Sequence, residues 1–204
     1  MEFSQANFCL MKKLIFASNN AHKAKEIRAL LGNIFEIITL REAGIEIDIP
    51  EPHATLEANA SEKSTTIFRM TQTDCFSEDS GLEVAALNGE PGVRSARYAG
   101  DRASDEQNNE LLLKKMEGVS KREARFRTVV SLILDGKEFL FEGTCEGNIA
   151  LQPSGKDGFG YDPVFIPVGY QQTFAEIGLE EKSIISHRKK AIAKMNDFLQ
   201  ALQK

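Results

Sequence analysis

Two long apolar runs that meet at Asp135-Gly136 constrain the fold of this chain more than any other feature. The runs extend from Ala124 to Leu134 and from Lys137 to Ile149, and each is typical of a strand. Asp-Gly between apolar runs is the strongest short-range signal for a β-hairpin, because both positions accept the positive φ of a two-residue turn. The chain therefore contains an antiparallel pair, and its sheet is predicted to be mixed.

The chain before and after this hairpin alternates short apolar runs with helical patterns, which is typical of an α/β protein. The predicted strands are 13–18 and 35–39, and the predicted helices are 21–31, 55–70, 104–116 and one from 187 to the C-terminus. Asn20, Thr55 and Ser104 are suitable N-caps, and Gly32 is expected to stop the first helix. The first helix is expected to bury Ala24, Ile27 and Leu31, and the last is expected to bury Ile192, Met195, Leu199 and Leu202. The polar residues Glu57, Asn59, Glu62 and Lys63 of the second helix are expected to face solvent.

Length and composition indicate one soluble globular domain. The 204 residues carry a net charge of −5, which argues against a general nucleic-acid surface. No apolar run approaches the roughly 18 residues of a membrane span, and the first ten residues lack the basic start of a signal peptide. Cys9, Cys75 and Cys145 lack C-x-x-C spacing, so free thiols in a reducing cytoplasm are expected. Residues 1–10 are predicted to be a loose extension, with Met11 a second possible start and 11–204 a single domain.

The segment Asp74 to Gly100 carries a pattern of acids followed by arginines. An apolar strand is predicted to end in Glu78 and Asp79, with a tight turn at Ser80-Gly81. Two acids at a strand end suit Mg²⁺, which prefers oxygen ligands; a polar hairpin turn is the alternative. Arg94 and Arg97 follow within the same segment. Acids for a cation and arginines for anions together indicate a metal-bound phosphate substrate.

Two helix beginnings and one loop are further candidates for ligand contacts. The strand-to-helix junction at Ser18 to Lys23 offers backbone N–H groups and a helix dipole to phosphate, although most such junctions bind nothing. His187 and Arg188 begin the last helix, where cations oppose the dipole unless an anion or polar ligand lies nearby. The glycine-rich loop from Ser154 to Asp162 could pack a flat ring, or it could be a turn with structural aromatic residues.

Six stretches, taken together, resemble the inosine triphosphate pyrophosphatase family. They are S-N-N-A-H-K (18–23), E-P-H-A-T-L-E-A-N-A (51–60), E-D-S-G-L (78–82), G-E-P-G-V-R-S-A-R-Y-A-G (89–100), G-F-G-Y-D-P-V-F (158–165) and E-K-S-I-I-S-H-R-K-K-A (181–191). The resemblance implies an elongated two-lobed α/β body with a long mixed β-sheet flanked by helices and the active site in the cleft between the lobes. It also implies a homodimer and Mg²⁺-dependent hydrolysis of ITP, dITP or XTP to the monophosphate and pyrophosphate.

The resemblance assigns roles to individual residues. Asp79 matches the acid that serves as general base and metal partner, with its two roles left open, and Glu51 matches an acid that helps to hold the metal; the residue pattern adds Glu78 to the metal site. Ser18, Asn20 and Lys23 match the triphosphate-binding loop, and the neighbouring Asn19, Ala21 and His22 are expected to contact the substrate with them. Ser80 matches a substrate contact beside the acid. The residues expected to bind the base are Phe159, Gly160, Tyr161, Asp162, Lys182, His187 and Arg188.

Two other functions stay open from the sequence. A Maf-type pyrophosphatase of modified pyrimidine nucleotides is one alternative, and the Ser186-His187-Arg188 element argues against it. A nucleotide-binding sensor without turnover is the other, and the intact acids Glu51 and Asp79 argue against it. A module that binds nucleic acid is least favoured, because the chain is acidic.

Overall fold

The computed structural model describes residues 12–31 and 35–202. The expected extension over residues 1–10, the alternative start at Met11, the thiol of Cys9 and the helix stop at Gly32 lie outside the described residues. Within the described part of the chain, no helix has both the length and the apolar character needed to cross a membrane.

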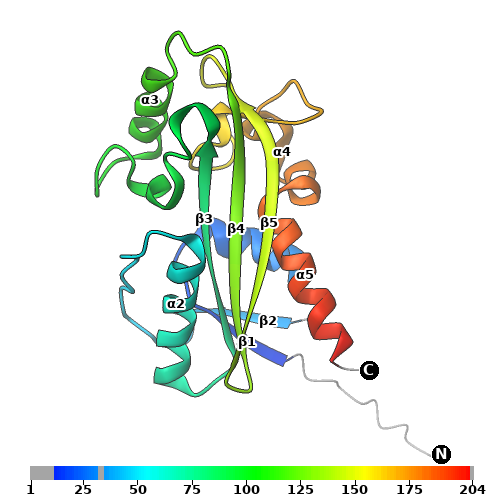
Figure 1. The fold of residues 1–204 in the computed structure, drawn as a ribbon. Helices are drawn as coiled ribbons and strands as arrows, with labels where there is room; N and C mark the ends of the chain where they lie inside the picture. The colour runs from blue at the N-terminus through cyan, green and yellow to red at the C-terminus, as the bar shows by residue number, and fades with distance from the viewer. Residues whose placement is uncertain (1–11, 32–34, 203–204) are drawn as a thin grey trace, which may run out of the picture.

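One six-stranded mixed sheet runs through the molecule (Figure 1). Its strands are β1 (Lys12–Phe16), β2 (Phe35–Thr39), β3 (Cys75–Val84), β4 (Glu123–Leu134), β5 (Lys137–Ile149) and β6 (Phe165–Pro167). The order across the sheet is β2-β1-β3-β4-β5-β6, with β2, β1 and β3 parallel and the later pairs antiparallel. The predicted hairpin and the mixed sheet are both confirmed.

Within the described residues, five α-helices flank this sheet, and the molecule forms two lobes joined by the long strands β3, β4 and β5 (Figure 1). The helices are α1 (Ala21–Leu31), α2 (Leu56–Thr71), α3 (Asp105–Lys115), α4 (Phe174–Ile185) and α5 (His187–Ala201). One lobe holds β1, β2, α1, α2 and most of α5, and the other holds α3, α4 and β6. The expected elongated two-lobed α/β architecture is therefore confirmed.

Helix starts follow the predicted capping residues. Asn20 Oδ1 accepts a hydrogen bond from Lys23 N at 3.0 Å, and Thr55 Oγ1 accepts one from Ala58 N. Ser104 forms a capping box with Gln107 at the start of α3. These side chains satisfy N–H groups that have no partner inside the helix, so local sequence sets where each helix begins.

Each lobe has its own apolar core. The first core packs α1 and α5 against the sheet and includes Phe16, Ile27 and Met195. The second core lies at the other end of the long strands and includes Leu82, Phe126 and Phe174. The buried stripe of α5 includes Ile192, Met195 and Leu199 as expected, but Leu202 is 58 % exposed because it lies one residue beyond the end of the helix.

The expected turn at Ser80-Gly81 is wrong, because β3 continues through it without interruption. All ten residues of β3 pair with β4, from Cys75 opposite Ile133 to Val84 opposite Ala124. Gly81 is needed for close approach: a Cβ there would overlap the carbonyl group of Gly92. The glycine that suggested a turn instead admits a neighbouring segment against the strand.

Candidate active site

A cavity of about 540 Å³ lies between the two lobes and is lined by residues from both. Of the residues predicted to bind the metal or the substrate, Ala21, Glu78 and Arg94 do not line it. Those that do are Ser18, Asn19, Asn20, His22, Lys23, Glu51, Asp79, Ser80, Arg97, Phe159, Gly160, Tyr161, Asp162, Lys182, His187 and Arg188. The fold therefore brings into one cleft residues that are up to 170 positions apart in the sequence.

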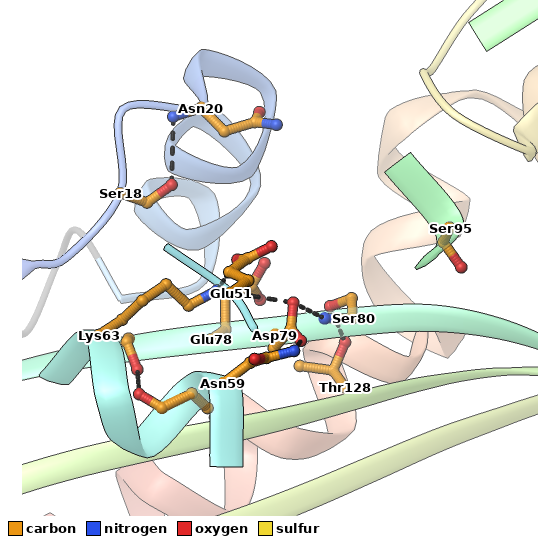
Figure 2. A network of polar contacts seen from close by, with 12 residues as sticks. Ser18, Asn20, Glu51, Asn59, Lys63, Glu78, Asp79, Ser80, Ser95 and Thr128 are labelled. Atoms are coloured by element: carbon orange, nitrogen blue, oxygen red, sulfur yellow. Dashed lines mark hydrogen bonds and ion pairs between the residues drawn. The ribbon is translucent and has the colours of Figure 1, made fainter. Parts of the chain in front are cut away.

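The start of α1 forms one wall of this cleft. Ser18 Oγ accepts a hydrogen bond from Asn20 N at 3.1 Å (Figure 2), and Asn20 in turn caps the helix. Asn19 Oδ1 accepts a hydrogen bond from Arg41 N at 3.2 Å, which ties the junction to the segment after β2. The junction is thereby held in one conformation, with the positive end of the helix dipole at the cavity.

Two carboxylates from different segments converge in the cleft on the ammonium group of Lys63. Lys63 Nζ forms an ion pair with Glu51 and lies 3.5 Å from Asp79 Oδ1 (Figure 2). Asp79 also accepts hydrogen bonds from Asn59 Nδ2 at 3.2 Å and from Ser80 N at 3.1 Å. The two carboxylates that hold the ammonium group of Lys63 also supply the oxygen ligands that a divalent cation prefers.

The expectation that Asn59 and Lys63 face solvent is wrong. Both are buried, at 0 % and 7 % exposed, and both contact Asp79. They lie one helical turn apart, within a buried stripe that also contains Leu56, Ala60, Ser64 and Ile67. Polar residues at positions where a helix otherwise buries apolar ones could have signalled a site, because a buried amide or ammonium needs a partner.

The loop that carries Glu51 is fixed from two sides. Arg97 Nη2 donates to the Glu51 carbonyl oxygen at 2.9 Å, and Arg97 Nη1 lies 3.4 Å from Glu51 Oε2. The Asn59 side chain accepts from His53 N at 2.9 Å and donates to its carbonyl oxygen at 3.3 Å. Asn59 thus holds both the Glu51 loop and Asp79. Arg94, also expected to bind anions, is exposed and does not line the cavity.

The pKa values of the two converging acids shift in opposite directions. Burial raises the pKa of Asp79, with Lys63 and Lys23 opposing the rise and Glu51 adding to it. Burial also raises the pKa of Glu51, but Lys63 and Lys23 outweigh it, so that pKa falls below its usual value. Asp79 is therefore the better proton acceptor of the two.

Glu78 faces a buried network of ionic side chains beside the cavity. Its two oxygens accept hydrogen bonds from Arg188 Nε and Nη2 at 2.7 and 2.8 Å, and Lys23 Nζ lies 3.2 Å from Oε1. Glu26 pairs with both Arg188 and Lys182, and Lys182 Nζ reaches Asp162 Oδ2 at 2.7 Å. Three acids and three bases balance in this network, so it adds no net charge to the cleft.

Aromatic rings line another part of the cavity. Phe159 stacks with His22 at 5.2 Å between ring centroids, and Lys182 Nζ lies 4.7 Å from the Phe159 ring. His187 is 3 % exposed and stacks on Phe126 at 4.6 Å. Its Nδ1 has no hydrogen-bond partner among the described residues. Burial, together with Arg188 and Lys182, lowers the pKa of His187 well below its usual value, so the ring is neutral at pH 7.

The cleft contains few protein ligands for a metal. No group of three or more His, Cys, Asp or Glu side chains converges as a metal cluster within 12–31 and 35–202. A metal held at Glu51 and Asp79 would complete its coordination with water and ligand oxygens. That arrangement is typical of Mg²⁺, which keeps several waters and binds through one or two carboxylates and substrate phosphates.

Comparison with known proteins places these features in context. The sequence profile of the Ham1 family matches residues 14–198. The dITP/XTP pyrophosphatase of Flavobacterium psychrophilum is 47 % identical over 186 residues, which cover 91 % of this chain and 98 % of that protein. The dITP/XTP pyrophosphatase of Porphyromonas gingivalis is 49 % identical over 190 residues, with 93 % and 98 % covered.

Solved structures of similar proteins have the same fold as this chain. The Ham1 protein of Staphylococcus aureus superimposes with a TM-score of 0.85 at 39 % identity, covering 93 % of this chain and 99 % of that one. The nucleoside-triphosphatase (dITP/XTP pyrophosphatase) of Mycobacterium abscessus superimposes with a TM-score of 0.74 at 38 % identity, covering 90 % and 98 %.

Proposed function

The chain belongs to the Ham1 family, and on that premise we propose that it hydrolyses non-standard purine nucleoside triphosphates to the monophosphate and pyrophosphate. The substrates are dITP, XTP and ITP, and the reaction removes these nucleotides from the pool. Relatives that match over nearly their full length carry the name dITP/XTP pyrophosphatase.

One observation carries this proposal: two acids, a helix start and several aromatic rings line the same cleft. Asp79 and Glu51 share Lys63, and Phe159 and His187 line the cavity with them. A purine nucleoside triphosphate combines the matching groups, with a highly charged chain joined through a sugar to a flat ring. The cleft is chemically complementary to that molecule.

The triphosphate lies against the start of α1. Lys23, Lys63 and Arg97 line the cavity together with Glu51 and Asp79 and offer cationic groups to the phosphates. The dipole of α1 adds to their attraction for an anion. Ser18 and Asn20, which fix the junction through their hydrogen bonds, present its polar atoms to the phosphates.

Glu51 and Asp79 are the residues that would hold Mg²⁺. When bound, Mg²⁺ would neutralise charge on the triphosphate and stabilise the negative charge of the leaving pyrophosphate. Both carboxylate oxygens of Glu78 accept hydrogen bonds from Arg188, and one of them also pairs with Lys23. Glu78 therefore supports this site by holding Lys23. Its direct contact with the metal stays a prediction.

Asp79 positions a water molecule and accepts its proton. The water oxygen bonds to the α-phosphorus, the bond from that phosphorus to the α–β bridging oxygen breaks, and pyrophosphate leaves with the bonding electrons. The raised pKa of Asp79 makes it a stronger base than an exposed aspartate, provided that it is ionised. Lys63 keeps it ionised by opposing the effect of burial.

The base lies between the Phe159 ring and the start of α5. Arg188 uses its Nε, Nη1 and Nη2 on Glu78 and Glu26, and retains further N–H donors for a ligand. Hypoxanthine and xanthine present a carbonyl at C6, where adenine presents an amino group. Donors on Arg188, Lys182 or His187 would be left unpaired by adenine, which is a large penalty in a buried pocket.

The oligomeric state and the location of the protein are also part of the proposal. We propose a homodimer in the cytoplasm that has no nucleic-acid or membrane partner. The net charge of −5 argues against a general nucleic-acid surface, and the described cysteines, Cys75 and Cys145, are buried free thiols.

The test is pyrophosphate release from ITP, dITP, XTP, GTP, ATP and a modified pyrimidine triphosphate, with and without Mg²⁺. Release from ITP, dITP and XTP that requires Mg²⁺ and greatly exceeds release from ATP and GTP is expected. Preference for the pyrimidine would favour the Maf-type activity instead. Tight binding of ITP without any turnover would leave a sensor and overturn the proposal.

A further inference from the structure

One peptide segment of the glycine-rich loop is held from both sides by helix α3. Gly160 N donates a hydrogen bond to Asp105 Oδ2 at 2.6 Å, and the Gly160 carbonyl oxygen accepts one from Asn109 Nδ2 at 3.0 Å. Asp105 and Asn109 are four positions apart on α3, so their side chains lie on one face of the helix. Neither residue was expected at a site from its sequence pattern.

The same part of α3 also holds the opposite segment of the cleft. Asn108 is 2 % exposed; its side-chain oxygen accepts from Ala99 N at 2.8 Å, and its Nδ2 donates to the Ala96 carbonyl oxygen at 3.2 Å. Arg97, which contacts Glu51, lies between these two residues. The first two turns of α3 therefore fix the glycine-rich loop relative to the segment that supports the acids.

Gly160 is the position where this loop most needs to be fixed. Its φ is +61°, in the left-handed region that glycine enters without steric cost, so the residue alone gives the loop little rigidity. The two bonds from α3 fix the peptide planes on either side of its Cα. Phe159, the preceding residue, shares the first of these planes. Its own N–H donates to Asp162 Oδ2 at 2.9 Å, so the bond from Gly160 to Asp105 is the second contact that sets the direction of its ring.

We propose that Asp105 and Asn109 are positioning residues that hold the Phe159 ring where the purine base binds. This inference rests on the proposed function and extends it: the pair acts on recognition of the base and not on the chemistry at the α-phosphorus. Among the described residues, neither Asp105 nor Asn109 forms a side-chain hydrogen bond or an ion pair with Asp79, Glu51 or Lys63. Their side chains bond to Gly160 instead.

The test compares Asp105→Ala with two matched variants. Asp105→Asn retains an oxygen that can accept from Gly160 N, and Glu106→Ala removes an exposed acid from the same helical turn without touching the loop. Asp105→Ala should raise KM for ITP about tenfold with kcat within about twofold, because a lost hydrogen bond of this kind weakens binding without changing the chemical step. Asp105→Asn should restore most of the affinity, and Glu106→Ala should match the wild type.

Two further measurements separate positioning from general structural damage. Hydrolysis of a base-free ribose triphosphate should be unchanged in Asp105→Ala, because it has no ring for Phe159 to contact. In the double variant Asp105→Ala/Phe159→Ala, KM should equal that of Phe159→Ala, since Asp105 acts through that ring. Equal losses on both substrates, or additive losses in the double variant, would overturn the proposal.

Hydrogen exchange keeps the test independent of turnover. In the free protein, Asp105→Ala should speed amide exchange in residues 156–162 and leave α2 and β3 unchanged, even if no nucleotide is hydrolysed. If the wild-type protein hydrolyses no nucleotide but Asp105→Ala still exchanges faster, the proposed function has failed while the contact between α3 and Gly160 stands. Unchanged exchange would mean that the clamp itself is absent.

Discussion

At the scale of single residues, the Asp79 carboxylate is subject to two opposing effects. Burial disfavours its charge, and Lys63 and Lys23 favour it. Because the folded-state pKa is raised, the contribution of this group to stability is greatest below its unfolded pKa and is lost as the pH rises through the folded value. Ionised Asp79 at neutral pH is thus maintained at some cost to stability, which is typical of a catalytic group.

Asp79→Asn tests this conflict directly. The substitution should lower kcat for ITP by about 10²- to 10⁴-fold, because the general base is lost. It should leave the thermal unfolding temperature equal to or above that of the wild type, because a buried charge is replaced by a neutral amide of the same shape. Steady-state kinetics and calorimetry at pH 7.5 measure the two effects. A variant that loses activity because it unfolds at a lower temperature would contradict this account.

Lys63→Gln should move the pH dependence of the reaction. Lys63 lowers the pKa of Asp79, so its removal should raise that pKa further and shift the acidic limb of the kcat/KM profile to higher pH. Activity at pH 8.5 should then exceed activity at pH 6.5 by a larger factor than in the wild type. Lys25→Gln, an exposed lysine on α1, is the control and should keep the wild-type profile. An unshifted limb would show that Lys63 does not control Asp79.

The sequence predicts which residues meet better than it predicts what each of them contacts. Asp79, Lys23 and Phe159 belong to recognisable stretches, and all three line the cavity. Glu78 was expected beside the cation, but neighbouring residues of a strand face opposite sides of a sheet, and Arg188 takes both its oxygens. Lys63 escaped detection because a lysine on a helix usually faces water, and only tertiary packing reveals that this one does not.

At the scale of elements, the approach of α5 to β5 sets the position of His187 and Arg188. The helix begins directly over the strand, and a Cβ at Gly143 would overlap both the His187 carbonyl oxygen and the Ala191 nitrogen. The strand therefore needs a residue without a side chain where the first turn of α5 rests on it. The predicted start of this helix is confirmed, but its depth on the sheet is not visible in a local pattern.

Gly143→Ala should push the first turn of α5 away from the sheet. Overpacking of this kind costs about 1–3 kcal/mol, and the shift should also raise KM for ITP because His187 and Arg188 move together. Urea unfolding and steady-state kinetics measure the two losses in one variant. Thr144→Ala, at the adjacent position whose side chain faces the other side of β5, should change both quantities far less. Loss of stability with an unchanged KM would separate α5 from base recognition.

The helices and strands that were predicted from local signals agree with the structure within three residues, whereas the extent of β3, which its pairing sets, was not predicted. The caps Asn20, Thr55 and Ser104 each mark a helix start because the bond they make is to their own helix. The E-D-S-G stretch was interpreted as a turn because Ser-Gly is common in turns. Pairing with all of β4 outweighs that preference, and only the neighbouring strand could supply this information.

At the scale of the whole molecule, a buried network of ionic residues joins segments that are far apart in the sequence. Glu26 of α1 pairs with Lys182 of α4 and Arg188 of α5, and Arg188 pairs with Glu78 in the middle of β3. Breaking one member of a buried pair is costly, because the remaining charge stays buried without a partner. The network therefore fixes the relative position of both lobes around the base end of the cleft.

Stability should fall in acid through this network, and Glu26→Gln should make the fall shallower. Burial raises the pKa of Glu26, but Arg188 and Lys182 outweigh it, so the folded-state pKa lies below the usual value of 4.5. The stability that Glu26 contributes is therefore present above that value and is lost as the pH falls through the folded-state pKa. At pH 7 the variant should be about 3–5 kcal/mol less stable than the wild type, because Arg188 loses a charged partner.

Urea unfolding at pH 7, 5, 4 and 3 should show this gap in unfolding free energy narrowing toward low pH. The control Glu110→Gln, at an exposed acid of α3, should keep a gap near zero throughout. A gap for Glu26→Gln that stays constant with pH would mean that its charge does not hold the lobes together.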